Sequence, residues 1–213
     1  MLDRFNMSTN LKKRIYTSIA LFLLLFAMLM NNYIFGYFLV VASVLSILEF
    51  SKMIMIILKN KKIKQFFFNL IFIIYIFSFI FVLLFFSSYL QLKILIFVII
   101  SCCVASDIGG FVFGKIFKGP KLTKISPRKT LSGSIGSLIF SSILISIISY
   151  YLTKNFDPFF ILVGCFTSVG CQVGDLFFSF MKRKSFIKDT GNYLPGHGGV
   201  LDRIDGMLLG IPI

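Results

Sequence analysis

The sequence FFFNLIFIIYIFSFIFVLLFFSSYL, residues 66–90, decides the fold class of this chain. The stretch contains no charged side chain, and as a helix rising 1.5 Å per residue it reaches about 37 Å. It can therefore cross a hydrocarbon core of about 30 Å with some tilt. We predict a membrane-spanning helix here.

The composition of the whole chain agrees with a membrane protein. Of its 213 residues, 57% are hydrophobic, 14% are charged and 28 are Phe. A soluble domain of this size needs a polar exterior that this composition cannot supply. The apolar runs are continuous, whereas a transmembrane barrel would show short alternating segments. We predict an all-α polytopic membrane protein that forms a single integral membrane domain, residues 1–213.

Six apolar runs are candidate spans, and a shorter seventh run follows them. We expect the first to be a span and not a cleaved signal peptide, because no small-residue cleavage site follows it. The seventh has about half the length of a span, so we expect a truncated or naturally shortened helix packed inside the bundle. Residues 1–100 should form the scaffold helices, and residues 101–213 the catalytic helices and cytoplasmic loops. The six runs cover residues 15–30, 33–58, 66–90, 92–113, 131–152 and 158–181, and the seventh covers residues 204–213.

The basic residues predict the topology. Of the 22 Lys and Arg residues, 20 lie in the N-terminal tail or in the segments 52–64, 115–129 and 182–203. Because cytoplasmic loops collect Lys and Arg, we expect a cytoplasmic N-terminus in a multi-pass protein of the cell inner (cytoplasmic) membrane. The candidate functional groups then lie on the cytoplasmic face. The net charge of +14 is explained by these loops, which suit an anionic membrane surface or phosphate-bearing substrates better than nucleic acid.

The most polar stretch is DLFFSFMKRKSFIKDTGNYLPGHGGVLDRID, residues 175–205. Asp202 and Asp205 are three residues apart, so at a helix start they share a face and can hold one divalent cation. For this pair alone, helix-start electrostatics is an equally good explanation. Asp175 adds a third carboxylate at the same membrane depth, where a buried charge must be neutralised. We therefore predict a metal site formed by Asp175, Asp202 and Asp205.

Basic and hydroxyl side chains near these carboxylates are candidate phosphate ligands. Lys182, Arg183 and Lys188 can clamp phosphate oxygens, and Ser179 shares a helical face with Asp175 and Lys182. The alternative is that these cations only anchor the chain on the cytoplasmic side. Asp189 is either a further ligand or the partner of Lys188.

A second basic turn, Ser126-Pro127-Arg128-Lys129-Thr130, leads into the fifth span. Its adjacent Arg and Lys suit a triphosphate held beside a metal. The alternative is a helix cap with cytoplasmic positive charge. His197 is the only histidine, and its Gly-rich loop allows a ligand to approach the backbone closely.

Two further acidic residues lie in apolar runs, and their roles are left open. Asp107 has Gly109 and Gly110 after it, within the fourth span. Glu49 has Lys52 one turn on, and a simple i,i+3 ion pair is one explanation of it. The cysteines also lie in apolar runs without a CxxC pair, so we expect neither disulfides nor a zinc site.

These motifs together resemble the phosphatidate cytidylyltransferases, or CDP-diacylglycerol synthases. The family signature places Ser, Lys-Arg, Lys-Asp, His-Gly-Gly and Asp-Arg-x-Asp at fixed spacings. Every element is in register here, at Ser179, Lys182-Arg183, Lys188-Asp189, His197-Gly198-Gly199 and Asp202-Arg203-Ile204-Asp205. Gln172-Val173-Gly174-Asp175-Leu176 is similar to a family QxGDL segment, and residues 126–130 are similar to its SPKKT loop. The resemblance is close from about Ser101 to Gly206.

The resemblance implies that CTP and phosphatidic acid react to give CDP-diacylglycerol and pyrophosphate. The catalytic residues would be Asp175, Asp202, Asp205 and Lys182, with one or two Mg²⁺ ions on the three aspartates. Substrate would contact Ser126, Arg128, Lys129, Ser179, Arg183, Lys188, His197 and Arg203. A homodimer is left open.

Two positions depart from the family pattern, and two other functions compete. Ser132 stands where the family usually has Glu, and the final helix, which normally crosses the membrane, is short here. A CTP-dependent polyprenol kinase would lack the complete signature register. An ion or solute carrier would show inverted repeats and polar groups at the midplane, and neither is visible.

Overall fold

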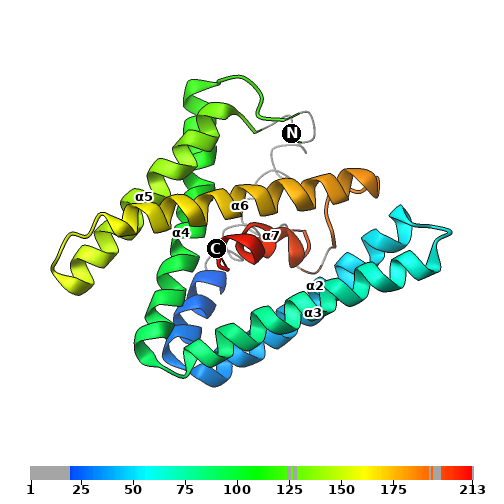
Figure 1. The fold of residues 1–213 in the computed structure, drawn as a ribbon, viewed down its shortest axis with the longest axis horizontal. Coiled ribbons are helices and arrows are strands. Elements are labelled where there is room, and N and C mark those ends of the chain that lie inside the picture. The colour runs from blue at the N-terminus through cyan, green and yellow to red at the C-terminus, as the bar shows by residue number, and fades with distance from the viewer. Residues whose placement is uncertain (1–19, 124–125, 127–128, 192, 194–197, 213) are drawn as a thin grey trace, which may run out of the picture. The chain divides into compact units, whose positions relative to one another are not determined.

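The computed structural model of the protein describes residues 20–123, 126, 129–191, 193 and 198–212. These residues are almost entirely helical, and an isolated antiparallel bridge joins Lys121 and Thr130. The helices are Ala20–Met30, α2 (Asn32–Ile57), α3 (Lys62–Ser87), α4 (Leu90–Phe117), α5 (Leu131–Thr153), α6 (Phe159–Lys184) and α7 (Leu201–Gly210), shown in Figure 1.

Five of these helices, α2 to α6, are long and apolar enough to cross a membrane, and Ala20–Met30 is a shorter apolar helix. The predicted polytopic all-α class is confirmed. Their outer surfaces agree with it, because Phe77 and Phe81 of α3 expose 68% and 71% of their area. Apolar side chains exposed on that scale are suited to contact with lipid. Residues 15–19 of the first predicted span lie outside the described residues.

The helices extend beyond the predicted apolar runs at ends that carry basic residues. α3 begins at Lys62, four residues before the predicted start, and α4 continues to Phe117, past Lys115. A lysine in the last turn suits the negative end of the helix dipole. Hydropathy marks the part of a helix that is apolar, whereas the hydrogen-bonded helix continues into its charged ends.

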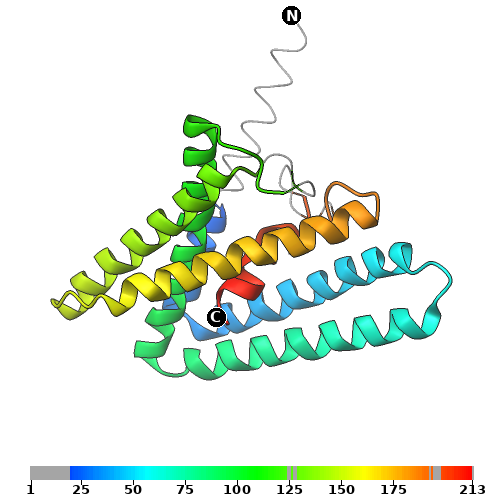
Figure 2. The same ribbon diagram turned by 45° about the horizontal axis from the view of Figure 1, so that its top comes forward.

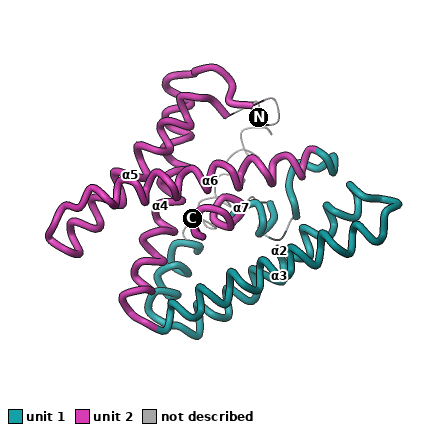
Figure 3. The backbone as a smooth tube through the Cα atoms, viewed as in Figure 1, with its two compact units in different colours: residues 1–88, 184–203 teal, residues 89–183, 204–213 magenta. Residues whose placement is uncertain are grey.

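The chain forms two compact units, coloured in Figure 3. Unit 1 contains residues 1–88 and 184–203, and unit 2 contains residues 89–183 and 204–213. The predicted single membrane domain, with its division near residue 100, stays a prediction.

In unit 1, α2 and α3 run antiparallel along their length, as Figures 1 and 2 show. Asn32 at the start of α2 donates to the carbonyl of Ser87 at the end of α3 (3.2 Å). Further along, the rings of Phe50 and Phe72 stack with centroids 3.9 Å apart. At the short connection between the two helices, Gln65 donates from its side chain to the carbonyl of Leu58 (2.9 Å).

In unit 2, small polar side chains join the long helices. Ser137 of α5 donates to the carbonyl of Ser106 in α4 (2.7 Å), and Ser141 donates to the carbonyl of Gly164 in α6 (2.9 Å). Hydroxyl-to-carbonyl bonds of this kind are a common means of joining helices in membranes. They hold α4, α5 and α6 as the frame of the unit.

The unit 2 part of α7 packs against α6. A Cβ atom on Gly174 would lie 2.5 Å from the carbonyl oxygen of Asp205, so the backbones approach too closely for any side chain there. Leu208 is buried, with 1% of its area exposed. The expectation that this short helix packs against other helices is therefore met within unit 2.

Candidate functional site

The loop between α4 and α5 positions Lys129. The amide of Leu122 donates to the carbonyl of Lys129 (2.8 Å), and the amide of Lys129 donates to the carbonyl of Ser126 (3.0 Å). Thr130 then caps α5 by accepting a hydrogen bond from the amide of Gly133 (3.1 Å). The helix cap that was the alternative explanation of this turn therefore exists, and it fixes the residue beside Lys129.

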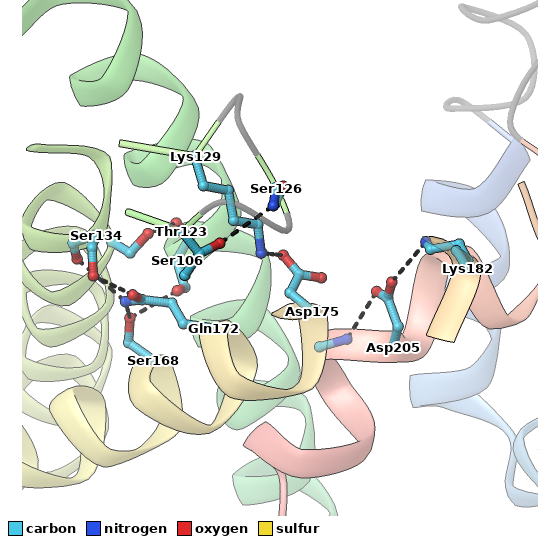
Figure 4. A network of polar contacts seen from close by, with 12 residues as sticks. Ser106, Thr123, Ser126, Lys129, Ser134, Ser168, Gln172, Asp175, Lys182 and Asp205 are labelled. Carbon is cyan, nitrogen blue, oxygen red and sulfur yellow. Dashed lines mark hydrogen bonds and ion pairs between the residues drawn. The ribbon is translucent and has the colours of Figure 1, made fainter. Parts of the chain in front are cut away.

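Two lysine–aspartate pairs lie in unit 2 (Figure 4). The Nζ atom of Lys129 lies 2.6 Å from Oδ2 of Asp175, and Nζ of Lys182 lies 3.5 Å from Oδ2 of Asp205. The pairs join the α4–α5 loop to α6, and α6 to α7. Each predicted metal ligand in this unit therefore has a predicted phosphate-binding or catalytic lysine as its partner.

Asp175 and Asp205 also influence each other. Asp205 is 8% exposed and accepts a hydrogen bond from the amide of Gly206 (2.9 Å). Burial, and then the neighbouring Asp175 carboxylate, raise the pKa of Asp205 to about 8, while Lys182 opposes the rise. Two neighbouring carboxylates, one of them buried, favour the binding of positive charge between them. This is the electrostatic environment expected of a divalent-cation site.

A cavity of about 270 Å³ opens beside Asp175 in unit 2. It is bounded by α4, α5, α6 and the loop that carries Lys129. Its polar lining comes from Asp107, Ser126, Lys129, Ser134, Gln172 and Asp175. Ligand pockets commonly measure about 300–1,000 Å³, so this cavity is slightly smaller, but its convergent polar groups suit part of a small molecule.

Gln172 connects this cavity to the helix frame (Figure 4). Its side-chain oxygen accepts a hydrogen bond from the hydroxyl of Ser134, and its Nε2 donates to the carbonyl of Ser134 (3.2 Å) and to Ser168 (3.3 Å). Ser168 in turn bonds Ser106 of α4 (2.8 Å). The amide side chain is held in one orientation by both neighbouring helices.

Asp202 lies in unit 1, at the first turn of α7. Its Oδ2 atom accepts from the amides of Thr190 (2.8 Å) and Gly199 (3.1 Å). The carboxylate therefore links Thr190 and Gly199 to the start of α7. Its place in the first turn also suits the positive end of the helix dipole. Since Asp202 and Asp205 are three residues apart on one helix, the predicted shared face is present.

The remaining predicted site residues lie in both units or outside the described residues. Ser179 lies in α6, half-buried and one turn after Asp175, and Arg183 is exposed near the end of that helix. Lys188 and Arg203 are exposed in unit 1. Arg128 and His197 lie outside the described residues. Their predicted contacts with substrate stay predictions.

The described residues contain no group of three or more His, Cys, Asp or Glu side chains gathered as a metal site. Unit 2 supplies a pair, Asp175 and Asp205. Mg²⁺ is commonly held by one or two carboxylates together with substrate phosphates and water, so a pair fits this ion. The predicted three-aspartate set, with Asp202, stays a prediction.

Sequence reasoning assigned no role to several polar residues of the cavity. The sequence does mark Gln172 and Asp107 as candidates, because placing a polar side chain at membrane depth costs free energy. Ser134 is not marked in this way, since serine is frequent throughout α5. The explanation of Glu49 as the partner of Lys52 is also replaced. Glu49 accepts hydrogen bonds from Thr190, Val200 and Leu201, while Lys52 lies over the ring of Tyr193.

Comparison with known proteins identifies the family. The model of the cytidylyltransferase family matches residues 4–213. This chain belongs to that family. A phosphatidate cytidylyltransferase of Rickettsia typhi is 40% identical over 128 residues, which cover 56% of each chain. Another from Helicobacter pylori strain 26695 is 41% identical over 114 residues, covering 50% of this chain and 40% of the relative.

The match to these relatives is partial in length. A phosphatidate cytidylyltransferase of Rickettsia bellii is 42% identical over 123 residues, covering 53% of this chain and 52% of its own. The chain thus spans about half the length of the curated relatives it matches. The family resemblance indicated by the signature residues is confirmed.

Proposed function

We propose that the protein is a phosphatidate cytidylyltransferase of the cytoplasmic membrane. It would transfer CMP from CTP to phosphatidic acid, giving CDP-diacylglycerol and pyrophosphate. Family membership and the names of the relatives support this activity. The observation that carries the proposal is that unit 2 pairs Lys129 with Asp175 and Lys182 with Asp205, all four of them motif residues.

The chemistry requires charge neutralisation more than a protein nucleophile. An oxygen of the phosphatidate phosphate attacks the α-phosphorus of CTP, and the bond to the bridging oxygen of the β-phosphate breaks. The pyrophosphate leaves with that electron pair. Because both reactants are anions, they must be aligned against their mutual repulsion, and preorganised cations lower that barrier.

The lysines and aspartates would divide this task. Asp175 and Asp205 would hold Mg²⁺, which when bound neutralises charge on the reacting phosphates. Before substrate binds, Lys129 and Lys182 balance these carboxylates. With Mg²⁺ held by these carboxylates, each lysine would contact phosphate oxygens as a point charge. The cavity lined by Gln172 and Ser134 would take part of the nucleotide.

The location follows from the same residues. The acyl chains of phosphatidic acid remain in the bilayer and CTP arrives from the cytosol, so the reaction needs a site at the membrane surface. The excess of Lys and Arg in the loop between α4 and α5 and in the segment that follows α6 supports the cytoplasmic face. A second metal ion and a homodimer stay predictions.

One assay tests the proposal and its nearest rival. The purified protein in lipid nanodiscs receives α-³²P-labelled CTP, phosphatidic acid and MgCl₂. We expect labelled CDP-diacylglycerol and one pyrophosphate per lipid, and no product without phosphatidic acid. Release of labelled CDP with a polyprenol acceptor, and no labelled lipid from phosphatidic acid, would instead identify a CTP-dependent kinase.

A further inference from the structure

Glu49 is a fully buried carboxylate in unit 1, far in sequence from the residues it contacts. Its exposure is 0%, and it lies in α2. Its Oε2 atom accepts from the hydroxyl of Thr190 (2.6 Å) and the amide of Leu201 (2.8 Å), and Oε1 accepts from the amide of Val200 (3.0 Å). A carboxylate is suited to this task because it only accepts hydrogen bonds and has two oxygens. One side chain of α2 therefore holds both ends of the segment 190–201.

Glycines allow the segment to close around this carboxylate. A Cβ atom on Gly199 would lie 2.5 Å from Oε2 and 2.6 Å from Oε1, and one on Gly191 would lie 2.5 Å from Oε1. No larger residue fits at either position without displacing Glu49. Gly191 and Gly199 therefore leave the space that the Glu49 carboxylate occupies, in addition to the hydrogen bonds that hold it.

The residues that contact Glu49 also hold Asp202. Thr190 contacts Glu49 through its hydroxyl and donates to Oδ2 of Asp202 through its amide (2.8 Å). Gly199 packs on Glu49 and donates to the same Oδ2 atom (3.1 Å). Glu49 thus acts on Asp202 through two residues that touch both.

We propose that Glu49 is a positioning residue, which fixes Thr190 and residues 199–201 so that Asp202 is presented at the start of α7. The inference rests on the proposed function together with the prediction from the sequence that Asp202 is a further ligand of the magnesium ion. A buried carboxylate is a costly way to gain stability alone, since an apolar side chain of similar size commonly serves as well. Groups that orient metal ligands typically change metal affinity when they are altered.

The test uses Glu49→Gln in the full-length chain in nanodiscs. Gln keeps the size of the side chain but replaces one acceptor oxygen with an NH₂ donor. In either orientation the amide of Val200 or of Leu201 loses its acceptor. We expect metal-free hydrogen exchange of the segment 190–201 to accelerate about tenfold or more, because local opening sets the exchange rate. By calorimetry, the dissociation constant for Mg²⁺ should rise about 10- to 100-fold.

A matched control and a milder variant complete the design. Asp157→Asn makes the same carboxylate-to-amide change at an exposed position, and Asn can still accept the amide of Phe159 there. It should change neither readout. Thr190→Val removes the hydroxyl contact with Glu49 and keeps the backbone donor to Asp202. Its effects should be in the same direction as those of Glu49→Gln and smaller.

The outcomes separate this inference from the proposed function. If Glu49→Gln lowers thermal stability but leaves segment exchange and Mg²⁺ affinity as in wild type, the positioning role is wrong. If Glu49→Gln does not fold, unchanged Mg²⁺ affinity in Thr190→Val overturns the inference. A wild-type protein that binds Mg²⁺, loses that affinity in Glu49→Gln and makes no CDP-diacylglycerol would reject the proposed function and support the positioning role.

Discussion

The ammonium group of Lys129 lies 2.6 Å from Oδ2 of Asp175, across 46 residues of sequence. Both side chains are a little over one-quarter exposed, at 29% and 28%. Ion pairs at such exposure contribute little to stability, typically about 0–1 kcal/mol. The position of the Lys129–Asp175 pair in the lining of the unit 2 cavity is better explained by function. Under the proposed function, Lys129 would compete with the metal ion for Asp175.

Lys129→Gln should therefore have opposite effects on the two ligands. Loss of the positive charge should raise the KM for CTP about 10- to 100-fold, since a charge-assisted hydrogen bond is worth about 1.5–3 kcal/mol. It should also lower the Mg²⁺ concentration for half-maximal rate, because Asp175 loses a competing cation. Steady-state kinetics at varied CTP and varied MgCl₂ would measure both.

Lys64→Met is the control for loss of a lysine charge, because Lys64 is exposed in α3 and belongs to unit 1. It should leave both constants unchanged. If Lys129→Gln raises the Mg²⁺ requirement together with the KM for CTP, Lys129 does not compete with the cation, and the proposed exchange of partners is wrong.

Asp175→Asn and Asp205→Asn should each abolish turnover without unfolding the protein. Asn is nearly isosteric with Asp and removes the ligand charge, so the rate should fall on the order of 10²-fold or more. Asp202→Asn tests the third predicted ligand in the same way. Turnover and melting temperature in nanodiscs would be measured together. Near-full activity of both Asp202→Asn and Asp205→Asn with Mg²⁺ would mean that these are helix-start carboxylates.

Gly174→Ala should separate α7 from α6. A Cβ atom there would lie 2.5 Å from the carbonyl oxygen of Asp205, so α7 must move. We expect a loss of about 1–3 kcal/mol from this overpacking, which exceeds the gain of about 1 kcal/mol from replacing Gly in a helix. Activity should fall as well, because Asp205 would move away from Lys182.

Gly36→Ala provides a matched comparison for that substitution. Gly36 also lies within a helix, but its nearest neighbour, Cδ2 of Leu84, would be 3.5 Å from the added methyl group. This variant should be neutral or slightly stabilising. Equal unfolding midpoints in denaturant for the two variants would show that α6 and α7 do not pack as described.

The elements that the sequence predicted are those with a local signal. Residues 66–90 are long and apolar enough to mark α3, and the spacing of Asp175 and Lys182 marks one face of α6. The start of α3 and the end of α4 were placed too far inside these helices, because hydropathy does not detect the helical turns that carry Lys62 and Lys115. Charge and periodicity therefore predict the elements and most of the candidate residues.

No local pattern in the sequence predicts which residues contact each other to build the site. Glu49 and Thr190 are 141 residues apart, and nothing near Glu49 indicates that it contacts the segment before α7. The same holds for Gln172 and Ser134, since Ser134 is one of many serines in α5. A one-dimensional pattern indicates which faces must be buried, whereas the partner of a given side chain depends on how the helices pack.

The last prediction concerns topology. α5 is a single helix of 23 residues, about 34 Å long, so it can cross the bilayer once. Lys121 precedes it and Lys154 follows it, so these residues should lie on opposite faces. The positive-inside rule places Lys61, Lys121 and Lys184 in the cytoplasm and Lys154 outside. All four are exposed and available for substitution by Cys.

Each single-Cys variant would be made in a background that lacks Cys102, Cys103, Cys165 and Cys171 and retains activity. A membrane-impermeant maleimide applied to intact cells should label position 154 and leave positions 61, 121 and 184 unlabelled. After the membrane is permeabilised, all four should react, which excludes burial as the reason for protection. Labelling of position 121 from outside would place the Lys129 loop away from cytosolic CTP. The topology and the proposed cytoplasmic site would then both be wrong.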